Sequence, residues 1–110
     1  MIRSVSSRAI QIGDRSYEQT IALTSDTVMD EWPATPVAGL TENDLSALLD
    51  TKPEVIVLGT GVTNVFPPRE LVFALARRGV GLEVMDTPAA ARTFNVLAGE
   101  NRQVVALLYL

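Results

Sequence analysis

The spacing of apolar residues changes character near residue 40. In the first part of the chain, Ile10 and Ile12 alternate with polar neighbours, and apolar side chains also alternate with polar ones through residues 17–24. Residues 13–16, Gly-Asp-Arg-Ser, are a turn signal between these two runs. A period of two on both sides of a turn predicts an antiparallel hairpin with one buried face. Prolines further on leave room for only a short strand around Val28.

From residue 41 the pattern changes to a helical stripe followed by a fully apolar strand. Thr41 with Asp44 three residues later is a helix-capping signal, and the apolar residues behind it are Leu45, Leu48 and Leu49. Pro53 ends this helix. Residues 55–58 are apolar without alternation, which predicts a parallel strand buried on both faces.

Two more helices and two more strands follow. Pro67-Pro68 opens one helix, residues 80–84 form a strand, and Asp86 or Thr87 caps the last helix. The buried stripes expected for these helices are Leu71, Val72, Leu75 and Ala76 in the first and Ala90, Phe94, Leu97 and Ala98 in the second. Residues 103–110 predict an inner strand whose direction the short connection before it leaves open.

The order of elements from residue 41 is therefore α-β-α-β-α-β. This alternation predicts an α/β fold of layered type, in which helices pack on a sheet and residues 1–40 add an antiparallel β element. We expect residues 1–110 to form a single domain. Right-handed crossovers would place the carboxyl ends of strands 55–58 and 80–84 at the same edge of the sheet.

Composition excludes several kinds of chemistry. The 110 residues are 47% hydrophobic and 20% charged and contain no Cys and no His, which rules out disulfides, Cys/His zinc sites and His-based catalysis. We therefore expect no metal site, no cofactor and no catalytic residue. The net charge of −4 argues against nucleic acid binding.

No apolar run reaches the roughly 20 residues of a membrane-spanning helix. Residues 1–13 also lack the apolar core of a signal peptide, so we expect a cytoplasmic protein without membrane insertion.

Several motifs in the second half resemble one widespread family. The motifs are Leu58-Gly59-Thr60-Gly61, Phe66-Pro67-Pro68, Val84-Met85-Asp86-Thr87 and residues 90–97. The family includes mitochondrial respiratory complex I assembly factor 3 and the adipogenesis-associated domain-containing protein of animals, and the similarity covers roughly residues 40–110.

This resemblance implies a fold with a mixed central sheet and an additional N-terminal β-hairpin layer. It implies no established enzyme activity, and its best-known member acts by binding proteins. Many members carry Cys where Ala91 stands and Tyr where Phe94 stands, so a thiol or phenol function cannot operate here.

The candidate binding residues fall at the expected sheet edge and on the last helix. Each has a structural reading beside the functional one: a tight glycine turn for residues 59–61, a helix cap for Asp86, and a solvated helix face or a pair with Asp86 for Arg92. The candidate binding residues are Thr60, Gly61, Thr63, Asp86, Arg92 and Asn95. Phe66 and Phe73 are candidates for an exposed interaction patch, with packing of Phe73 under the hairpin as the alternative.

These observations leave more than one function open. The preferred hypothesis is a non-catalytic module that binds a protein partner, similar to an assembly factor. The alternative is a domain or enzyme that binds a small anionic ligand at the carboxyl ends of the strands, with Arg92 supplying charge and the Gly61 region supplying backbone donors. A third reading is a homodimer that associates through the Phe73 side or the edge of the hairpin.

Overall fold

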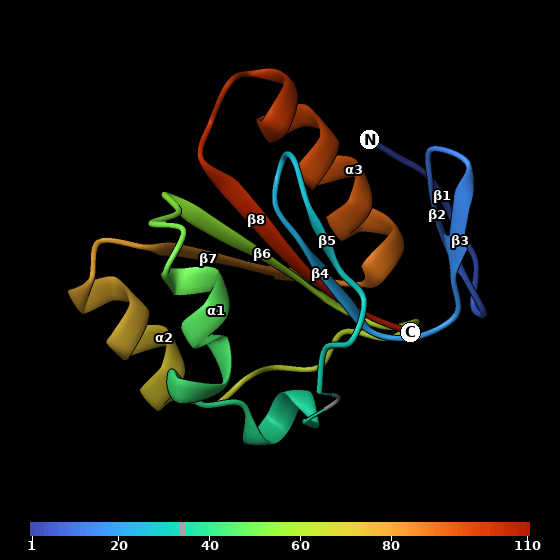
Figure 1. Ribbon diagram of the computed structural model, residues 1–110. Coiled ribbons are helices and arrows are strands. Elements are labelled where there is room, and N and C mark those ends of the chain that lie inside the picture. Colours follow the sequence, from blue (N-terminus) through green and yellow to red (C-terminus); the bar gives the residue numbers. More distant parts are fainter. Residues whose placement is uncertain (34) are drawn as a thin grey trace.

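The computed structural model describes residues 1–33 and 35–110 (Figure 1). The strands are β1 (Ile2–Val5), β2 (Ile10–Ile12), β3 (Arg15–Tyr17), β4 (Ile21–Leu23), β5 (Val28–Met29), β6 (Val55–Thr60), β7 (Gly81–Met85) and β8 (Val104–Tyr109). The helices are α1 (Ser46–Leu49), α2 (Arg69–Arg77) and α3 (Thr87–Gly99), with 3₁₀ helices at Val37–Gly39 and Asn43–Leu45. The fold is the mixed α/β arrangement that the sequence predicts.

A five-stranded mixed sheet forms the centre of the molecule, in the order β5-β4-β8-β6-β7. Strand β6 runs parallel to both β7 and β8, whereas β4 runs antiparallel to β8 and β5. Every residue of β6 and of β8 is buried. The central position predicted for residues 55–58 is confirmed, and the last strand is parallel to it.

Helices cover the two faces of this sheet. In β6, Val55 and Val57 face α3 and pack in a cluster with Phe94, whereas Ile56 and Leu58 belong to a second cluster with the residues of α1 and α2. Figure 1 shows α3 on one side of the sheet and α1 and α2 on the other. A strand covered on both faces needs apolar residues at consecutive positions, which explains why residues 55–58 do not alternate.

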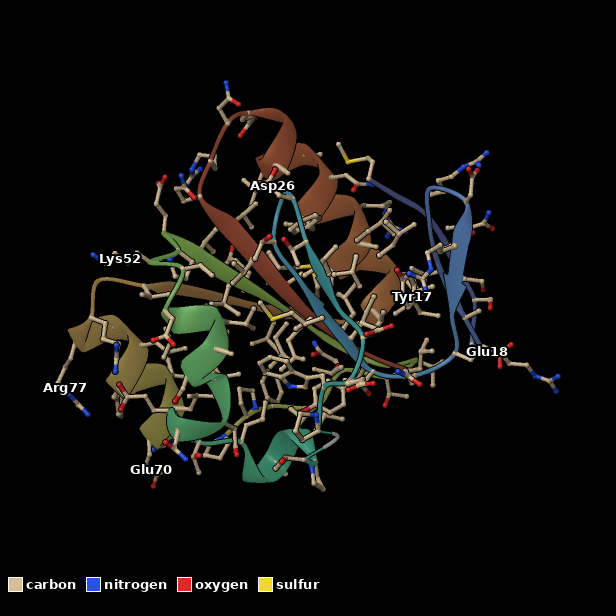
Figure 2. The ribbon with its side chains drawn as sticks, in the orientation of Figure 1. Tyr17, Glu18, Asp26, Lys52, Glu70 and Arg77 are labelled. Carbon is tan, nitrogen blue, oxygen red and sulfur yellow. The ribbon has the colours of Figure 1, made fainter. Side chains whose placement is uncertain are left out.

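The N-terminal part contains the expected hairpin, formed by β2 and β3, but differs from the prediction in its extent. Strands β1, β2 and β3 form a separate three-stranded antiparallel sheet that packs on α3, and β1 is an additional strand. Residues 17–24 do not form one strand, because β3 ends at Tyr17 and β4 belongs to the five-stranded sheet. Since β4 lies between β5 and β8 and under α3, all three of its residues are buried. Figure 2 shows Tyr17 between the small sheet and α3.

Two helices also differ in detail from the prediction. Thr41 and Asp44 form reciprocal bonds between side chain and backbone, but the turn they cap is a 3₁₀ helix that leads into the short α1. In α2 the buried residues are Leu71, Ala74 and Leu75, while Val72 and Ala76 are exposed. The helix is therefore rotated relative to the predicted stripe and presents the small Ala74 to the core.

Candidate functional site

The carboxyl ends of β6 and β7 meet at one edge of the sheet, as right-handed connections require. Gly59 lies opposite Met85, and the loop after β6 contacts the start of α3. The Thr87 amide donates to the Gly61 carbonyl oxygen at 2.9 Å, and the Gly61 amide donates to the Thr87 hydroxyl at 2.8 Å. This reciprocal pair fixes the loop to the helix.

Thr87 is the central side chain of this edge. It is 1% exposed, and its hydroxyl also donates to the Tyr109 carbonyl oxygen at 2.5 Å. One hydroxyl thus joins the ends of β6 and β8 to the first residue of α3. The sequence predicted only a capping role for Thr87, and Asp86 fills that role: its Oδ1 accepts the Ala89 amide at 2.8 Å.

The Thr60 hydroxyl shapes the loop that follows it. It lies 2.6 Å from the Thr63 carbonyl oxygen, to which it donates, and it accepts the Val65 amide at 3.2 Å. The Met85 carbonyl oxygen is a more distant acceptor at 3.3 Å. Thr60 is buried and Thr63 is exposed, so the polar groups of Thr60 are bonded within the protein.

Two glycines are required at this edge. A Cβ on Gly59 would lie 2.9 Å from both Cα and Oγ1 of Thr87 and 3.0 Å from the Cβ of Ala90. Gly61 has φ of +98°, a conformation that side chains disfavour. The glycine motif therefore allows α3 to approach β6 closely and the chain to turn at once.

A small cavity opens at the same edge, with a volume of about 100 Å³. Its walls include Val5, Gly61, Thr87 and Tyr109. The Tyr109 hydroxyl donates to the Thr35 carbonyl oxygen. Burial, together with the nearby charge of Asp44, raises the pKa of Tyr109 to about 12.

The two polar candidates on α3 have different surroundings. Asn95 donates to the Ile2 carbonyl oxygen at 2.7 Å and accepts the Ile2 amide at 3.1 Å, which ties β1 to α3. Arg92 is exposed, and it forms no ion pair with Asp86 or with any other residue of 1–33 and 35–110. The Asn95 contact could not be predicted from the sequence, because β1 itself was not predicted.

The two candidate patch residues lie at the surface. Phe66 is 76% exposed in the loop before α2, and Phe73 is 59% exposed on α2. The alternative in which Phe73 packs under the N-terminal strands is wrong, because these strands cover α3 on the opposite side of the five-stranded sheet.

Together these features define an α/β fold in which α3 lies between two sheets and is bonded to the central strands. The model for the family described as protein of unknown function (DUF498/DUF598) matches residues 2–109, and the chain belongs to this family. The resemblance found in the sequence is thereby confirmed.

Similar proteins carry names of two kinds. The chain is 33% identical over 109 residues to human NADH dehydrogenase [ubiquinone] 1 alpha subcomplex assembly factor 3, covering 97% of this chain and 59% of the relative. It is 28% identical over 100 residues to a "13 kDa major membrane protein" of Francisella tularensis, covering 90% and 80%. The chain thus spans about three-fifths of the human assembly factor.

A solved structure supports the fold directly. A protein of Xanthomonas campestris, determined by NMR, superposes with a TM-score of 0.90 at 35% identity, covering 99% of this chain and 83% of that one. In the part of our chain that the structure describes, no helix has the length and apolar character needed to cross a bilayer.

Proposed function

We propose that the protein is a non-catalytic, single-domain module that binds another protein, in the manner of an assembly factor. Its contact surface would be the aromatic patch, which we define as the exposed apolar side chains of residues 62–73. These are Val62, Val65, Phe66, Val72 and Phe73.

The concentration of exposed apolar residues carries this proposal. Residues 62–73 hold five of the seven large hydrophobic side chains exposed in residues 1–33 and 35–110. Phe66 and Phe73 are two of the three phenylalanines of the chain, and the third, Phe94, is buried in the core. Burying a phenylalanine contributes roughly 1.5–3 kcal/mol, so leaving two in water has an energetic cost that a partner would remove.

Charged residues lie on α2 on either side of Phe73 in the sequence. Figure 2 shows Glu70 and Arg77 projecting outward from this helix, and Arg69 precedes Phe73 by one turn. Exposed aromatic residues with arginines nearby favour a protein interface, because aromatic residues and arginine are enriched there.

The relatives support the class of function. Proteins named as assembly factors act on other proteins, and the polar groups of Thr60 and Asp86 are bonded within this chain rather than directed at a substrate.

We further propose that the module is cytoplasmic. One relative is named a membrane protein, so the test is to separate cytosol from membranes in cells that express the protein and to measure the amount of the protein in each fraction. Recovery chiefly with membranes would contradict the cytoplasmic assignment.

The experiment compares three aspartate variants in affinity isolation from the native cell. Phe66→Asp and Phe73→Asp should lose a partner that the unmodified protein retains. Val96→Asp is the matched control, because Val96 is 58% exposed but lies on α3, outside the patch. Circular dichroism should show that all three variants melt like the parent, since exposed positions tolerate substitution within about 0.5 kcal/mol.

Binding of the isolated partner is then measured with purified proteins. Equal retention by the patch variants and the parent would refute the proposal. If the retained partner is a second copy of the chain, sedimentation at several concentrations shows a dimer that Phe73→Asp dissociates.

A further inference from the structure

Strand β7 is an open edge of the five-stranded sheet. It pairs with β6 on one side, and no strand of residues 1–33 and 35–110 pairs with it on the other side (Figure 1). An edge strand presents backbone N–H and C=O groups that another chain can bind. The aromatic patch lies on α2 and on the loop before it, so it leaves this edge unexplained.

The other sheet edges are blunted in ways that β7 is not. Strand β5 has only two residues and β3 has three, and the register of β1 with β2 shifts between Ile2 and Ser4. Short strands and irregular register are common protections against pairing with another chain. Strand β7 has five residues, and its register with β6 runs without a break from Gly81 to Met85.

The pairing with β6 shows which backbone groups of β7 are free. The Gly81 amide donates to the Glu54 carbonyl oxygen at 2.9 Å, so Gly81 turns its backbone groups toward β6. The Met85 carbonyl oxygen, four residues further on, also faces β6, where it lies 3.3 Å from a threonine hydroxyl. Successive residues of a strand alternate in this direction, so the N–H and C=O groups of Leu82 and Val84 point away from β6.

The side chains of β7 differ between its two faces. Leu82 and Val84 are half-buried and pack against the core cluster that contains the residues of α1 and α2. Glu83 points to the opposite face, yet it is exposed, because α3 packs mainly on β6 and β8. Within residues 1–33 and 35–110 it forms no ion pair. A strand added beside β7 would therefore meet two apolar side chains on one face and an unpaired carboxylate on the other.

This carboxylate disfavours a second copy of the chain as the occupant of the edge. If two β7 strands paired antiparallel through Leu82 and Val84, each Glu83 would lie directly opposite its own counterpart. Residues opposed in this way have Cα atoms only about 4.5 Å apart, and like charges at such positions are destabilising. A basic residue at the opposed position has the reverse effect.

We propose that β7 binds an extended segment of a protein partner, which adds to the sheet as an antiparallel strand with the pattern apolar-basic-apolar. The basic residue lies opposite Glu83. The two apolar residues lie opposite Leu82 and Val84 and exchange backbone hydrogen bonds with them. The inference rests on the proposed function in taking a protein as the partner, and it deepens that function by naming the segment that the partner offers.

The test uses purified protein and the acetylated, amidated peptide Ser-Val-Lys-Val-Ser as the probe, with amide NMR as the readout. We expect saturable shifts of the Leu82 and Val84 amides. The analogue with glutamate in place of lysine should bind about fivefold more weakly, because it opposes two carboxylates. Glu83→Lys should reverse this preference. Glu100→Lys makes the same change of net charge at an exposed position outside β7, so it is the matched control and should keep the preference of the parent.

Methylation of the peptide nitrogens tests the backbone contacts separately. N-methylation of both valines removes the N–H groups that bond to Leu82 and Val84, and it should abolish the saturable shifts. N-methylation of the lysine is the matched control, because the lysine N–H points away from β7. This control peptide should bind like the unmodified one.

The outcomes separate this inference from the proposed function. Phe73→Asp alters the aromatic patch and should bind the peptide like the parent. The inference is overturned if the peptide gives no saturable shift at Leu82 and Val84, if the lysine and glutamate peptides bind equally, or if valine methylation has no effect. Loss of the cellular partner by the patch variants would then still support the proposed function. A dimer of the parent in which the Leu82 and Val84 amides are protected from hydrogen exchange would show that a second copy occupies the edge, and this result also overturns the inference.

Discussion

Replacing Thr87 by valine tests whether one buried hydroxyl holds the carboxyl edge of the sheet together. Valine keeps nearly the same volume but removes the acceptor of the Gly61 amide and the donor to the Tyr109 carbonyl oxygen. An unpaired buried polar group costs about 1–3 kcal/mol. Both groups border the cavity of about 100 Å³, where water can partly replace the hydroxyl, so we expect the low end of this range for each.

The predicted loss for Thr87→Val is therefore about 2–3 kcal/mol, a large part of the 5–15 kcal/mol typical of a domain. Guanidinium titration followed by Trp32 fluorescence measures it, because Trp32 packs against the core and becomes exposed on unfolding. Thr87→Ser keeps the hydroxyl and removes one buried methyl group, and should cost about 1 kcal/mol.

Thr93→Val is the matched control on the same helix. Among residues 1–33 and 35–110, the Thr93 hydroxyl has a hydrogen bond only to the Met85 sulfur, at 3.3 Å, so its removal should change stability by less than about 0.5 kcal/mol. The reasoning is refuted if Thr87→Val is as stable as the parent, or if Thr87→Ser is the more damaging of the two substitutions.

Three further predictions concern close approach, the β1 contact and pH. Gly59→Ala should destabilise the protein by about 1–3 kcal/mol, because the new Cβ would lie 2.9 Å from Thr87. Gly39→Ala is the control and should be nearly neutral, because its Cβ would have no atom within 4 Å. Chemical denaturation measures the free energy of unfolding of both variants. Asn95→Ala should speed hydrogen exchange of the Ile2 amide, which loses its acceptor, and unchanged exchange would show that β1 is held by other contacts. Burial raises the pKa of Tyr109 from 10.0 to about 12. Between these two pH values the folded state keeps a proton that the unfolded chain releases. The stability that this provides is therefore full below about pH 10 and is lost as the pH rises toward 12. Denaturation from pH 9 to 12 should show a steeper decline for the parent than for Tyr109→Phe, and parallel declines would contradict the assignment.

The sequence predicted the second half of the fold well because its signals are local. An uninterrupted apolar run identified β6 as a central strand, and prolines and Asp86 marked the starts of α2 and α3. The N-terminal part was predicted only in part: β2 and β3 form the expected hairpin, but alternation shows which side chains share a face and not which strand lies alongside. Residues 17–24 alternate throughout, yet they divide between two sheets.

The candidate site was predictable in position but not in its chemistry. Parallel strands place the residues after β6 and β7 at one edge, and that position follows from chain order alone. The bonds of Thr87 and Asn95 reach residues more than 20 positions away, so no local pattern reveals them. Phe73 is a contrasting case: its place outside the apolar stripe of α2 left exposure and packing under the hairpin both open, and only the structure decides for exposure.

The central position of β8 has a consequence for how the chain folds. Strand β8 lies between β4 and β6, and it pairs residue 108 with residue 21 on one side and with residue 59 on the other. Without β8, the strands from the first 30 residues share no backbone pairing with those from residues 55–85. Neither half can therefore complete its sheet alone. The chain must first close long loops, which costs conformational entropy, before strand pairing stabilises the sheet. We expect a single cooperative transition, with a rate set by the docking of β8 rather than by the formation of any helix.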